Sequence, residues 1–281
     1  MAMDASLAGK ESAPRDFTYD WKTLATYALG IGAKKDELEY LYENTAGGIR
    51  VYPTFAVVPA FPVMHDILFA TKANWAMVVH GSQSIRLHGP LPAEGTIRTV
   101  GTLRGIYDMK RFASVIVDAR STVDGKPVFD TTWTIIVREA GNFGGPRPPA
   151  DDSPNVPKDR APDFSFEEKT TPEQALLYRL SGDPNPLHAD PAFAASVGFQ
   201  QGPILHGLCT YGFVGRAIVK HACGGDPAKL RSFAAQFRKP VWPGDTILTE
   251  GWDLGAGKWA IRASVKERPD PVLTGAWAEI G

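Results

Sequence analysis

Four stretches of the chain alternate between apolar and polar residues, as strands with one buried face do. They form two pairs, and a turn separates the members of each pair: Asp124–Pro127 in the first half and Arg268–Pro271 in the second. The four stretches are 112–123, 127–137, 259–267 and 272–280. The pattern therefore predicts two antiparallel strand pairs, one in each half of the chain.

A longer period marks a helix in the second half. Apolar residues recur at positions 208, 211, 214 and 218, and Gly224-Gly225 fits a helix end. The other positions of this helix are mostly small or apolar, which predicts that a sheet encloses it. In the first half, segment 27–45 is helical but charged and segment 61–78 is broken in pattern. We therefore expect a short or displaced central helix there.

The two halves also share sequence. Residues 90–101 match residues 240–251 at an offset of 150 positions, with identities at Pro90/Pro240, Thr96-Ile97/Thr246-Ile247, Thr99/Thr249 and Gly101/Gly251. Residues 141–163 contain six prolines and no hydrophobic period, which is typical of an extended linker. We predict an internal duplication: an N-terminal repeat (16–140), the linker (141–163) and a C-terminal repeat (164–281), with joined sheets.

A long antiparallel sheet curled around one central helix is the hotdog arrangement. The predicted fold class is therefore α+β: a double hotdog of two such repeats, in which the helix of the first repeat is reduced. Such a protein has room for a large core, because 43% of the 281 residues are apolar.

Charge and targeting signals narrow the class of protein further. Thirty basic and 31 acidic residues leave a net charge of −1, and no basic block occurs. The chain shows no uninterrupted apolar run near the length of a bilayer span, no targeting pattern at its ends, and only two cysteines. We expect a soluble, cytoplasmic protein that binds neither nucleic acid nor a membrane.

Candidate chemistry lies in one loop, "YRLSGDPNPLH" at 178–188. Asp183 and His188 stand five positions apart, two prolines restrict the backbone between them, and Asp190-Pro191 begins a short helix just beyond. A loop fixed in this way suits an acid and a base that share one target. The alternative is a solvated turn, because Asp, Asn, Pro and Gly are the ordinary residues of tight turns.

Two features favour chemistry in this loop. Leu180, Leu187 and Phe193 flank it and predict that it is tucked against the core, where an unpaired carboxylate would be costly. Gly207 begins the buried helix, so its N–H group, with the helix dipole behind it, could stabilise an oxygen that gains negative charge. The alternative role for Gly207 is close packing at a helix start.

The segments "YRLSGDPNPLHADPAFAASVGF" and "GPILHGLCTYGF" resemble the hydratase-2 motif of MaoC-type (R)-specific enoyl-CoA hydratases. "ALGIGA", "YPTFAVVPAF", "VVHGSQSIRLHGPLP" and "FRKPVWPGDT" are similar to the two-repeat form of that family, found alone or as the hydratase unit of peroxisomal multifunctional enzyme type 2. The resemblance implies reversible hydration of trans-2-enoyl-CoA to (3R)-3-hydroxyacyl-CoA in fatty-acid β-oxidation or hydroxyacyl supply. It implies no metal and no redox cofactor.

The resemblance also implies roles for individual residues. Asp183 and His188 would activate a water for addition to C3 and supply a proton to C2. Asn185 would orient this pair, and the N–H group of Gly207 would bind the thioester oxygen. The residues implied in substrate binding are His80, Gly81, Lys110 and Phe237, with Arg111 as an alternative to Lys110. Only the second repeat carries the motif, so we expect one active site per chain.

Three other functions compete with this interpretation. A hotdog thioesterase usually carries its carboxylate on or beside the central helix, and the predicted central helix contains no Asp or Glu. A non-catalytic acyl-thioester binding subunit would not need Asp183, Asn185 and His188 together. A metal site of His188, Asp190 and His206 is disfavoured, because Asp190 is better explained as a helix cap.

Other properties are expected from the resemblance or stay open. A reduced helix in the first repeat would open space for medium- to long-chain acyl groups. Proteins of this family often form homodimers, and a peroxisomal location would follow if the chain were cut from a longer eukaryotic enzyme. The sequence leaves open whether the carrier is CoA or an acyl carrier protein, and in which direction the reaction runs.

Overall fold

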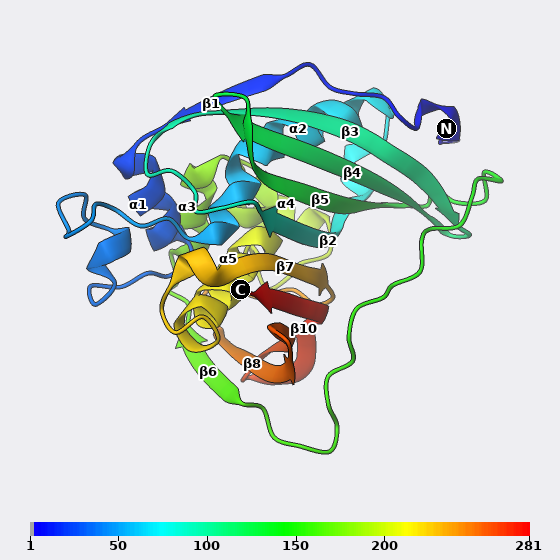
Figure 1. Ribbon diagram of the computed structural model, residues 1–281. Coiled ribbons are helices and arrows are strands. Elements are labelled where there is room, and N and C mark those ends of the chain that lie inside the picture. Colours follow the sequence, from blue (N-terminus) through cyan, green and yellow to red (C-terminus); the bar gives the residue numbers. More distant parts are fainter. Residues whose placement is uncertain (1–2) are drawn as a thin grey trace.

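The computed structural model describes residues 3–281 and contains a ten-stranded antiparallel sheet. Its strand order is β1-β3-β4-β5-β2-β7-β10-β9-β8-β6 (Figure 1). The first five strands are β1 (Arg15–Tyr19), β2 (Val78–Leu87), β3 (Gly95–Met109), β4 (Phe112–Val123) and β5 (Lys126–Arg138). The last five are β6 (Phe164–Lys169), β7 (Leu230–Phe237), β8 (Thr246–Gly255), β9 (Lys258–Val265) and β10 (Arg268–Ile280).

Helices occupy the inner side and the ends of this sheet. The α-helices are α1 (Trp21–Gly30), α2 (Val57–Ala70), α3 (Gln174–Tyr178), α4 (Pro191–Ser196) and α5 (Gly207–His221). Short 3₁₀ helices are η1 (Ala5–Leu7), η2 (Leu38–Tyr40), η3 (Pro53–Ala56), η4 (Trp75–Met77), η5 (Arg179–Ser181), η6 (Pro186–His188) and η7 (Pro227–Lys229). Every residue of α5 from Leu208 to Val219 is buried, as predicted for a helix enclosed by a sheet.

The strand order reads the same from both edges of the sheet, which confirms the predicted duplication and double hotdog. Helix α2 begins at Val57 and α5 begins at Gly207, while β2 ends at Leu87 and β7 ends at Phe237. Each of these pairs is separated by the 150 positions found in the sequence match. The two half-sheets join where β2 pairs antiparallel with β7, from Ser82↔Gln236 to Arg86↔Ser232.

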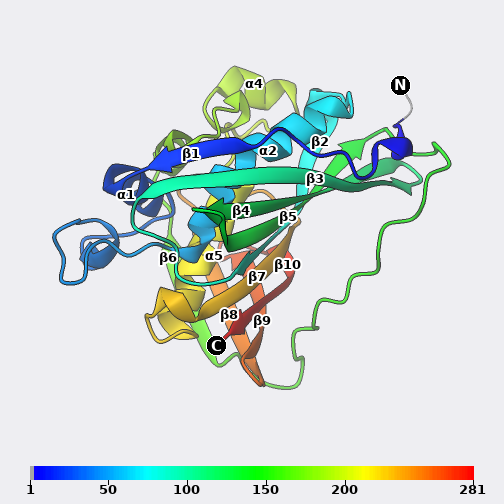
Figure 2. The same cartoon turned by 45° about the horizontal axis from the view of Figure 1, so that its top comes forward.

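The first-repeat helix is not reduced, and this expectation is wrong. Helix α2 has 14 residues and α5 has 15. Pro62 interrupts the apolar pattern of α2, yet the helix persists because Val63 and Ile67 pack closely against Gly101 of β3. Figure 2 shows α2 lying along β1 and β3.

Together, η3 and α2 form an 18-residue apolar helix, Pro53–Ala70, with a mean hydropathy of 1.4. Length and composition alone would let this helix cross a membrane. Because 67% of it is buried inside the fold, it serves as the core helix of the first repeat. Segment 27–45, the other expected helix of this half, is mostly irregular: α1 ends at Gly30 and only η2 follows.

One of the two predicted strand turns is displaced. Asp124 and Gly125 both adopt positive φ and connect β4 to β5 as expected. In the second repeat the chain turns at Lys266-Glu267, and Arg268 already pairs with Val265. The pairing of β10 with β9 is irregular between Arg268 and Pro271. This irregularity lets the strand continue through the residues of the predicted turn.

Between β5 and β6 the chain runs without helix or strand, as a green trace along the right-hand side of Figure 1. The segment is nevertheless attached to the sheet. The carboxylate of Asp108 accepts hydrogen bonds from the backbone N–H groups of Asn142 and Gly144, at 3.0 and 2.9 Å. Further along, the side-chain amide of Gln236 donates to the carboxylate of Asp151.

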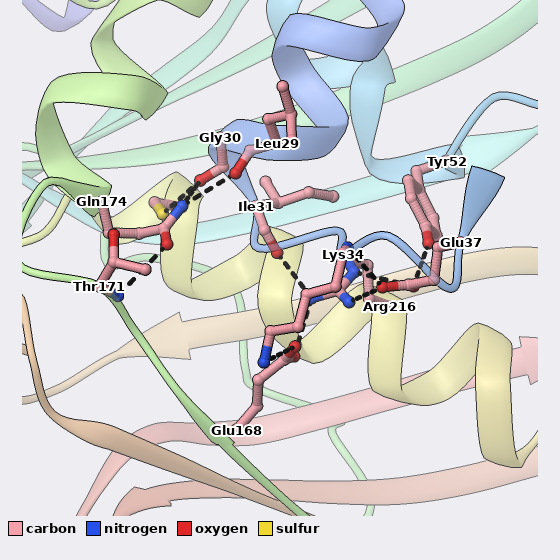
Figure 3. Close-up of polar contacts among 11 residues, drawn as sticks. Leu29, Gly30, Ile31, Lys34, Glu37, Tyr52, Glu168, Thr171, Gln174 and Arg216 are labelled. Atoms are coloured by element: carbon pink, nitrogen blue, oxygen red, sulfur yellow. Dashed lines mark hydrogen bonds and ion pairs between the residues drawn. The ribbon is translucent and has the colours of Figure 1, made fainter. Parts of the chain in front are cut away.

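A buried polar network joins the first repeat to α5 (Figure 3). The Arg216 guanidinium donates to the carbonyl of Ile31 at 2.9 Å and to the carboxylate of Glu168 at 2.8 Å, and it also binds Glu37. The side-chain amide of Gln174 donates to the carbonyls of Leu29 and Gly30 at 3.0 and 2.7 Å. These bonds satisfy carbonyls at the C-terminal end of α1 with side chains of the second repeat.

Replacing Arg216 should therefore destabilise the fold strongly. In Arg216→Met, Glu37 and Glu168 lose the cation that compensates their burial, so we expect the free energy of unfolding to fall by about 3–5 kcal/mol. The matched control is Arg104→Met, which removes a pair with Asp118 whose side chains are 45% and 32% exposed. That change should cost less than about 1 kcal/mol. Equal losses in denaturant unfolding of the two variants would contradict this account.

Candidate active site

Hydrogen bonds between its own side chains and its backbone N–H groups shape the loop between α3 and α4. Gly182 has a φ of 112° and ends η5, a conformation that favours glycine. The Asp183 carboxylate then accepts a hydrogen bond from the N–H of Asn185 at 3.1 Å. The side-chain oxygen of Asn185 accepts from the N–H of Leu187 at 3.0 Å and caps η6. Asn185, which is exposed, thereby fixes the turn that carries His188.

The surroundings of His188 keep its ring neutral and fix which of its two nitrogens carries the proton. Its Nδ1 lies 2.8 Å from the carbonyl oxygen of Ile204. A carbonyl can only accept, so Nδ1 carries the proton and Nε2 keeps a free lone pair. Burial lowers the pKa of His188, opposed by the bond to Ile204 and by the charge of Asp183. The ring is therefore available as a proton acceptor at neutral pH.

Asp183 and His188 point toward a common region. One carboxylate oxygen of Asp183 and one ring nitrogen each from His188 and His206 all lie within 4.8 Å of one another. Two hydrogen bonds of about 2.8 Å can bridge such a separation through a single water. This geometry fits the prediction that the carboxylate of Asp183 and the imidazole of His188 bind the same water molecule.

His206 contacts both residues of this pair: the backbone of Asp183 and the ring of His188. It is the N-cap residue of α5 and is 1% exposed. Its Nε2 lies 3.2 Å from the backbone oxygen of Asp183, and its ring stacks on His188 with centroids 3.7 Å apart. His206 therefore ties the loop to the start of the central helix. The sequence motif contains this histidine, but no local signal revealed its stacking partner.

The geometry fits a metal ion poorly. Stacked imidazole rings with an interplanar angle of 28° direct their in-plane lone pairs side by side, not toward one ion. Asp190, the third ligand of the competing metal hypothesis, instead accepts from the N–H groups of Ala192 and Phe193 at 2.8 and 3.2 Å. It is a helix cap, as expected.

Gly207 begins α5 beside an aromatic ring. The first N–H groups bonded within the helix are those of Cys209 and Thr210, which share the carbonyl of His206. The N–H of Gly207 precedes them and has no protein acceptor among residues 3–281. A Cβ at this position would lie 3.2 Å from the ring of Phe237, so any larger residue would require that ring to shift.

Three of the four implied substrate-binding residues lie together next to Gly207. The rings of His80 and Phe237 are 4.7 Å apart, and His80 also stacks on Trp133 at 5.2 Å. Burial lowers the pKa of His80 to about 4, and its Nε2 lies 3.0 Å from the carbonyl of Ser82. Gly81 occupies an irregular step of the β2–β5 pairing, where a Cβ would meet Ile136 at 2.8 Å.

Lys110 lies apart from this group. It occupies the exposed tip of the β3–β4 hairpin with a φ of 65°, and Arg111 beside it is exposed as well. The hairpin tip lies at the pair Met109↔Phe112. His80 pairs with Ile135, and Ile135 pairs on its other side with Val115. Val115 is three residues along β4 from the tip. A role for Lys110 with the substrate therefore requires a ligand that extends along the sheet.

Two of the three apolar residues expected to bury the loop around Asp183 and His188 are exposed, so this part of the sequence prediction is wrong. Leu180 is 65% exposed and Phe193 is 39% exposed, so these flanks do not tuck the loop against the core. Tyr178, which is 2% exposed and whose ring lies 4.9 Å from that of His206, anchors the loop instead. Leu and Phe in a short irregular segment have no period from which burial can be inferred.

Helix α2 carries part of an aromatic cluster that the sequence did not reveal. The ring of His65 lies 4.3 Å from Phe61 and 5.1 Å from Trp75. Burial lowers the pKa of His65, and the negative charge of Asp183 opposes that shift.

The fold is a double hotdog, and the side chains of Asp183, His188 and His206 come together at the start of α5. The family model described as "MFE-2 hydratase 2 N-terminal domain" matches residues 17–139, and "MaoC like domain" matches residues 154–275. The chain belongs to this MaoC-like hydratase family, in its two-repeat form.

Individual relatives match across nearly the full chain. The 3-hydroxyacyl-thioester dehydratase Y of Mycobacterium tuberculosis is 40% identical and covers 94% of this chain and 92% of its own. The peroxisomal enoyl-CoA hydratase 2 of Arabidopsis thaliana is 37% identical, with coverages of 92% and 89%. A solved MaoC-like dehydratase from Phytophthora capsici has a TM-score of 0.90 at 34% identity, covering 100% of this chain and 98% of that one.

The buried histidines predict acid sensitivity of the fold. Burial lowers the pKa of His80 to about 4 and that of His206 to about 2, below the roughly 6.5 of an unfolded histidine. The unfolded chain therefore takes up protons first as the pH falls, and stability is lost on acidification.

We expect the free energy of unfolding to decrease by about 1 kcal/mol per pH unit for each of these histidines between about pH 6.5 and pH 5. Denaturant titrations across this range measure the slope. His80→Gln should remove one histidine's share of it. A stability that is constant or rises on acidification would contradict the neutral state assigned to these rings.

Proposed function

We propose that this chain catalyses (R)-specific hydration of trans-2-enoyl-CoA to (3R)-3-hydroxyacyl-CoA, and the reverse dehydration, in fatty-acid β-oxidation. The observation that carries the proposal is the convergence of Asp183 and His188 within 4.8 Å, next to the unbonded N–H of Gly207. Family membership and relatives named as enoyl-CoA hydratases support it.

The bonding changes follow from this geometry. Water lies between the Asp183 carboxylate and Nε2 of His188, and its oxygen bonds to C3 as one proton passes to this pair. The π electrons of the C2–C3 double bond move toward the thioester carbonyl, and C2 then takes a proton from the same pair. No other acid or base is required, and acid–base assistance of this kind contributes about 10²–10⁴ in rate.

The thioester oxygen gains charge as this enolate forms. The N–H of Gly207, at the positive end of a helix that is buried from Leu208 to Val219, is the donor that faces this charge. Phe237 packs against Gly207 and fixes where the thioester can lie. We propose that these residues suffice without a metal or redox cofactor, because every bond that changes belongs to water or the substrate.

The alternative candidate, a thioesterase, has one structural observation in its favour. Glu37 and Glu168 lie beside the central helix α5, although neither belongs to it. Both carboxylates bind Arg216, and Glu168 is 6% exposed, so neither is free to activate a water. Hydration therefore accounts better for the residues at the start of α5. Binding without catalysis would leave Asp183, Asn185 and His188 unexplained.

Several finer properties stay predictions. Relatives from Arabidopsis thaliana and Mus musculus are named as peroxisomal enzymes, which supports a role in β-oxidation. Whether this chain is located in the cytoplasm, as expected from its sequence, or in a peroxisome is a separate prediction. We also predict that the protein forms a homodimer and that its substrate is carried by CoA, not by an acyl carrier protein.

Removing either member of the pair should abolish turnover without unfolding the protein. For Asp183→Asn and His188→Gln we expect kcat for crotonyl-CoA hydration to fall by about 10²–10⁴, because each removes the acid–base group and leaves the cradle intact. The decrease in enoyl-thioester absorbance measures the rate.

Asp190→Asn is the matched control for these variants. It removes a carboxylate two positions from His188, and asparagine still caps α4, so activity should stay within about twofold of the unaltered protein. Near-normal turnover of both Asp183→Asn and His188→Gln would refute the proposed roles.

The stereochemistry of the product tests the assignment independently. Chiral analysis of the hydrated thioester should give the (3R) isomer, because the pair and Gly207 fix one face of the double bond. An (S) product would show that water arrives from the opposite face and would exclude the arrangement proposed here.

A further inference from the structure

A cavity of about 190 Å³ lies near the end of helix α5 that is distant from the catalytic loop. Residues 226–228, which follow that end of the helix, line one side of it, and the buried residues Ile49 and Val51 line another part. Helix α5 has 15 residues, so about 22 Å of helix separates this region from Gly207. Protein interiors leave few gaps larger than one water, so a cavity of this size has room for a ligand.

The cavity is the counterpart, in the other repeat, of the catalytic end of the β2–β7 joint. Ser84 of β2 pairs with Ala234 of β7, and 150 positions separate these two residues. The strand pairing is therefore symmetric about this pair. On one side of it, His80 lies four residues before Ser84, and Phe237 lies three residues after Ala234 and packs against Gly207.

Leucines occupy the equivalent positions on the other side of the pair. Leu230 lies four residues before Ala234, and Leu87 lies three residues after Ser84. Both leucines are buried, and both line the cavity. The duplicated fold thus has a recess at each end of the joint: one with the groups proposed for catalysis, and one lined by leucines.

This second recess has no acid or base in the place of the catalytic pair. The positions equivalent to Asp183 and His188, at an offset of 150, are Ala33 and Leu38. Neither of these side chains can transfer a proton. The cavity is therefore suited to binding and not to hydration.

The interior of the cavity suits a hydrocarbon chain. Its buried lining residues all have apolar side chains: Ile49, Val51, Pro53, Leu87 and Leu230. A cavity of roughly 150 Å³ lined by Leu, Ile and Phe stays dry and binds benzene. By that comparison, the larger cavity here accommodates a chain of roughly seven or eight carbons.

A cation stands where the cavity opens to solvent. Arg50 is an exposed lining residue, and its Nη1 donates to the carbonyl of Gly225 at 3.2 Å. Its Nη2 lies 3.8 Å from the carboxylate of Asp226, which is too far for a hydrogen bond. That carboxylate instead accepts from the N–H of Ala228 at 3.1 Å and caps η7. Arg50 thus keeps N–H groups that can bind the carboxylate of a ligand.

We propose that this cavity is a second, non-catalytic site, which takes the hydrocarbon tail of a medium-chain fatty acid and holds its carboxylate at Arg50. The tail lies among the buried leucines, and the head group stays at the solvent-exposed rim. This site does not depend on the proposed hydratase function, because its ligand undergoes no reaction there.

Titration of the full chain with octanoate, followed by ligand-observed NMR, tests the proposal. Ala228→Trp should weaken octanoate binding by at least about tenfold, because the indole occupies the space of the tail. Arg50→Gln should weaken it by about two- to fivefold, a small effect because the guanidinium is 44% exposed. The matched control is Arg86→Gln. It removes the same charge from an exposed position next to Leu87 that does not line the cavity, so the affinity should stay unchanged.

Two results would overturn the proposal. One is absence of octanoate binding, and the other is equal affinity of Ala228→Trp, Arg50→Gln and the unaltered protein, which would place octanoate elsewhere. Thermal unfolding checks that each variant is folded, and the comparison of Arg50→Gln with Arg86→Gln decides the question if Ala228→Trp is unstable.

Hydration assays separate this site from the catalytic one. Ala228→Trp and Arg50→Gln should hydrate crotonyl-CoA as fast as the unaltered protein, because the cavity and the Asp183 loop lie at opposite ends of α5. Loss of hydration in both folded variants would show that the cavity belongs to the catalytic site and would overturn the proposal. A protein that binds octanoate as described but hydrates no enoyl thioester would instead overturn the proposed function and leave this second site standing.

Discussion

The antiparallel pairing of β2 with β7 is the contact on which the rest of the molecule depends. It joins two five-stranded halves into one sheet and sets the two repeats in a symmetric arrangement around the joint. Glu37, in the loop after α1, then pairs with Arg216 on α5, the central helix of the other repeat. Without this pairing, His80 on β2 and Phe237 on β7 would not meet. The ring of Phe237 would also not be held against Gly207.

The same arrangement gives the two halves different chemistry at equivalent positions. At an offset of 150 residues, Asp183, His188 and Gly207 correspond to Ala33, Leu38 and Val57. None of these three residues can move a proton, and the valine side chain fills the space that a glycine leaves open. The first-repeat loop carries instead the buried pairing of Glu37 with Arg216. One repeat thus provides charge pairing that holds the halves together, and the other provides the groups proposed for catalysis.

Local signals predicted much of this from sequence. The period of the central helix, the alternation of the strands and the offset between Pro90 and Pro240 gave the double hotdog, and two prolines and a helix cap indicated a rigid loop around Asp183. Tertiary contacts decided what these signals missed. Pro62 disrupts the helical pattern, yet packing on β3 keeps α2 intact. No period could show that the rings of His188 and His206 stack with their centroids 3.7 Å apart.

The central claim is that Asp183 and His188 act on one oxygen while Gly207 holds another. A crystal structure of Asp183→Asn with a bound (3R)-3-hydroxyacyl-CoA tests it most directly, because the product's hydroxyl marks where the water had been. The account predicts that the 3-hydroxyl oxygen lies within hydrogen-bond distance of residues 183 and 188, with the thioester oxygen at the N–H of Gly207. A hydroxyl directed away from both side chains, or a thioester oxygen bound elsewhere, would contradict it.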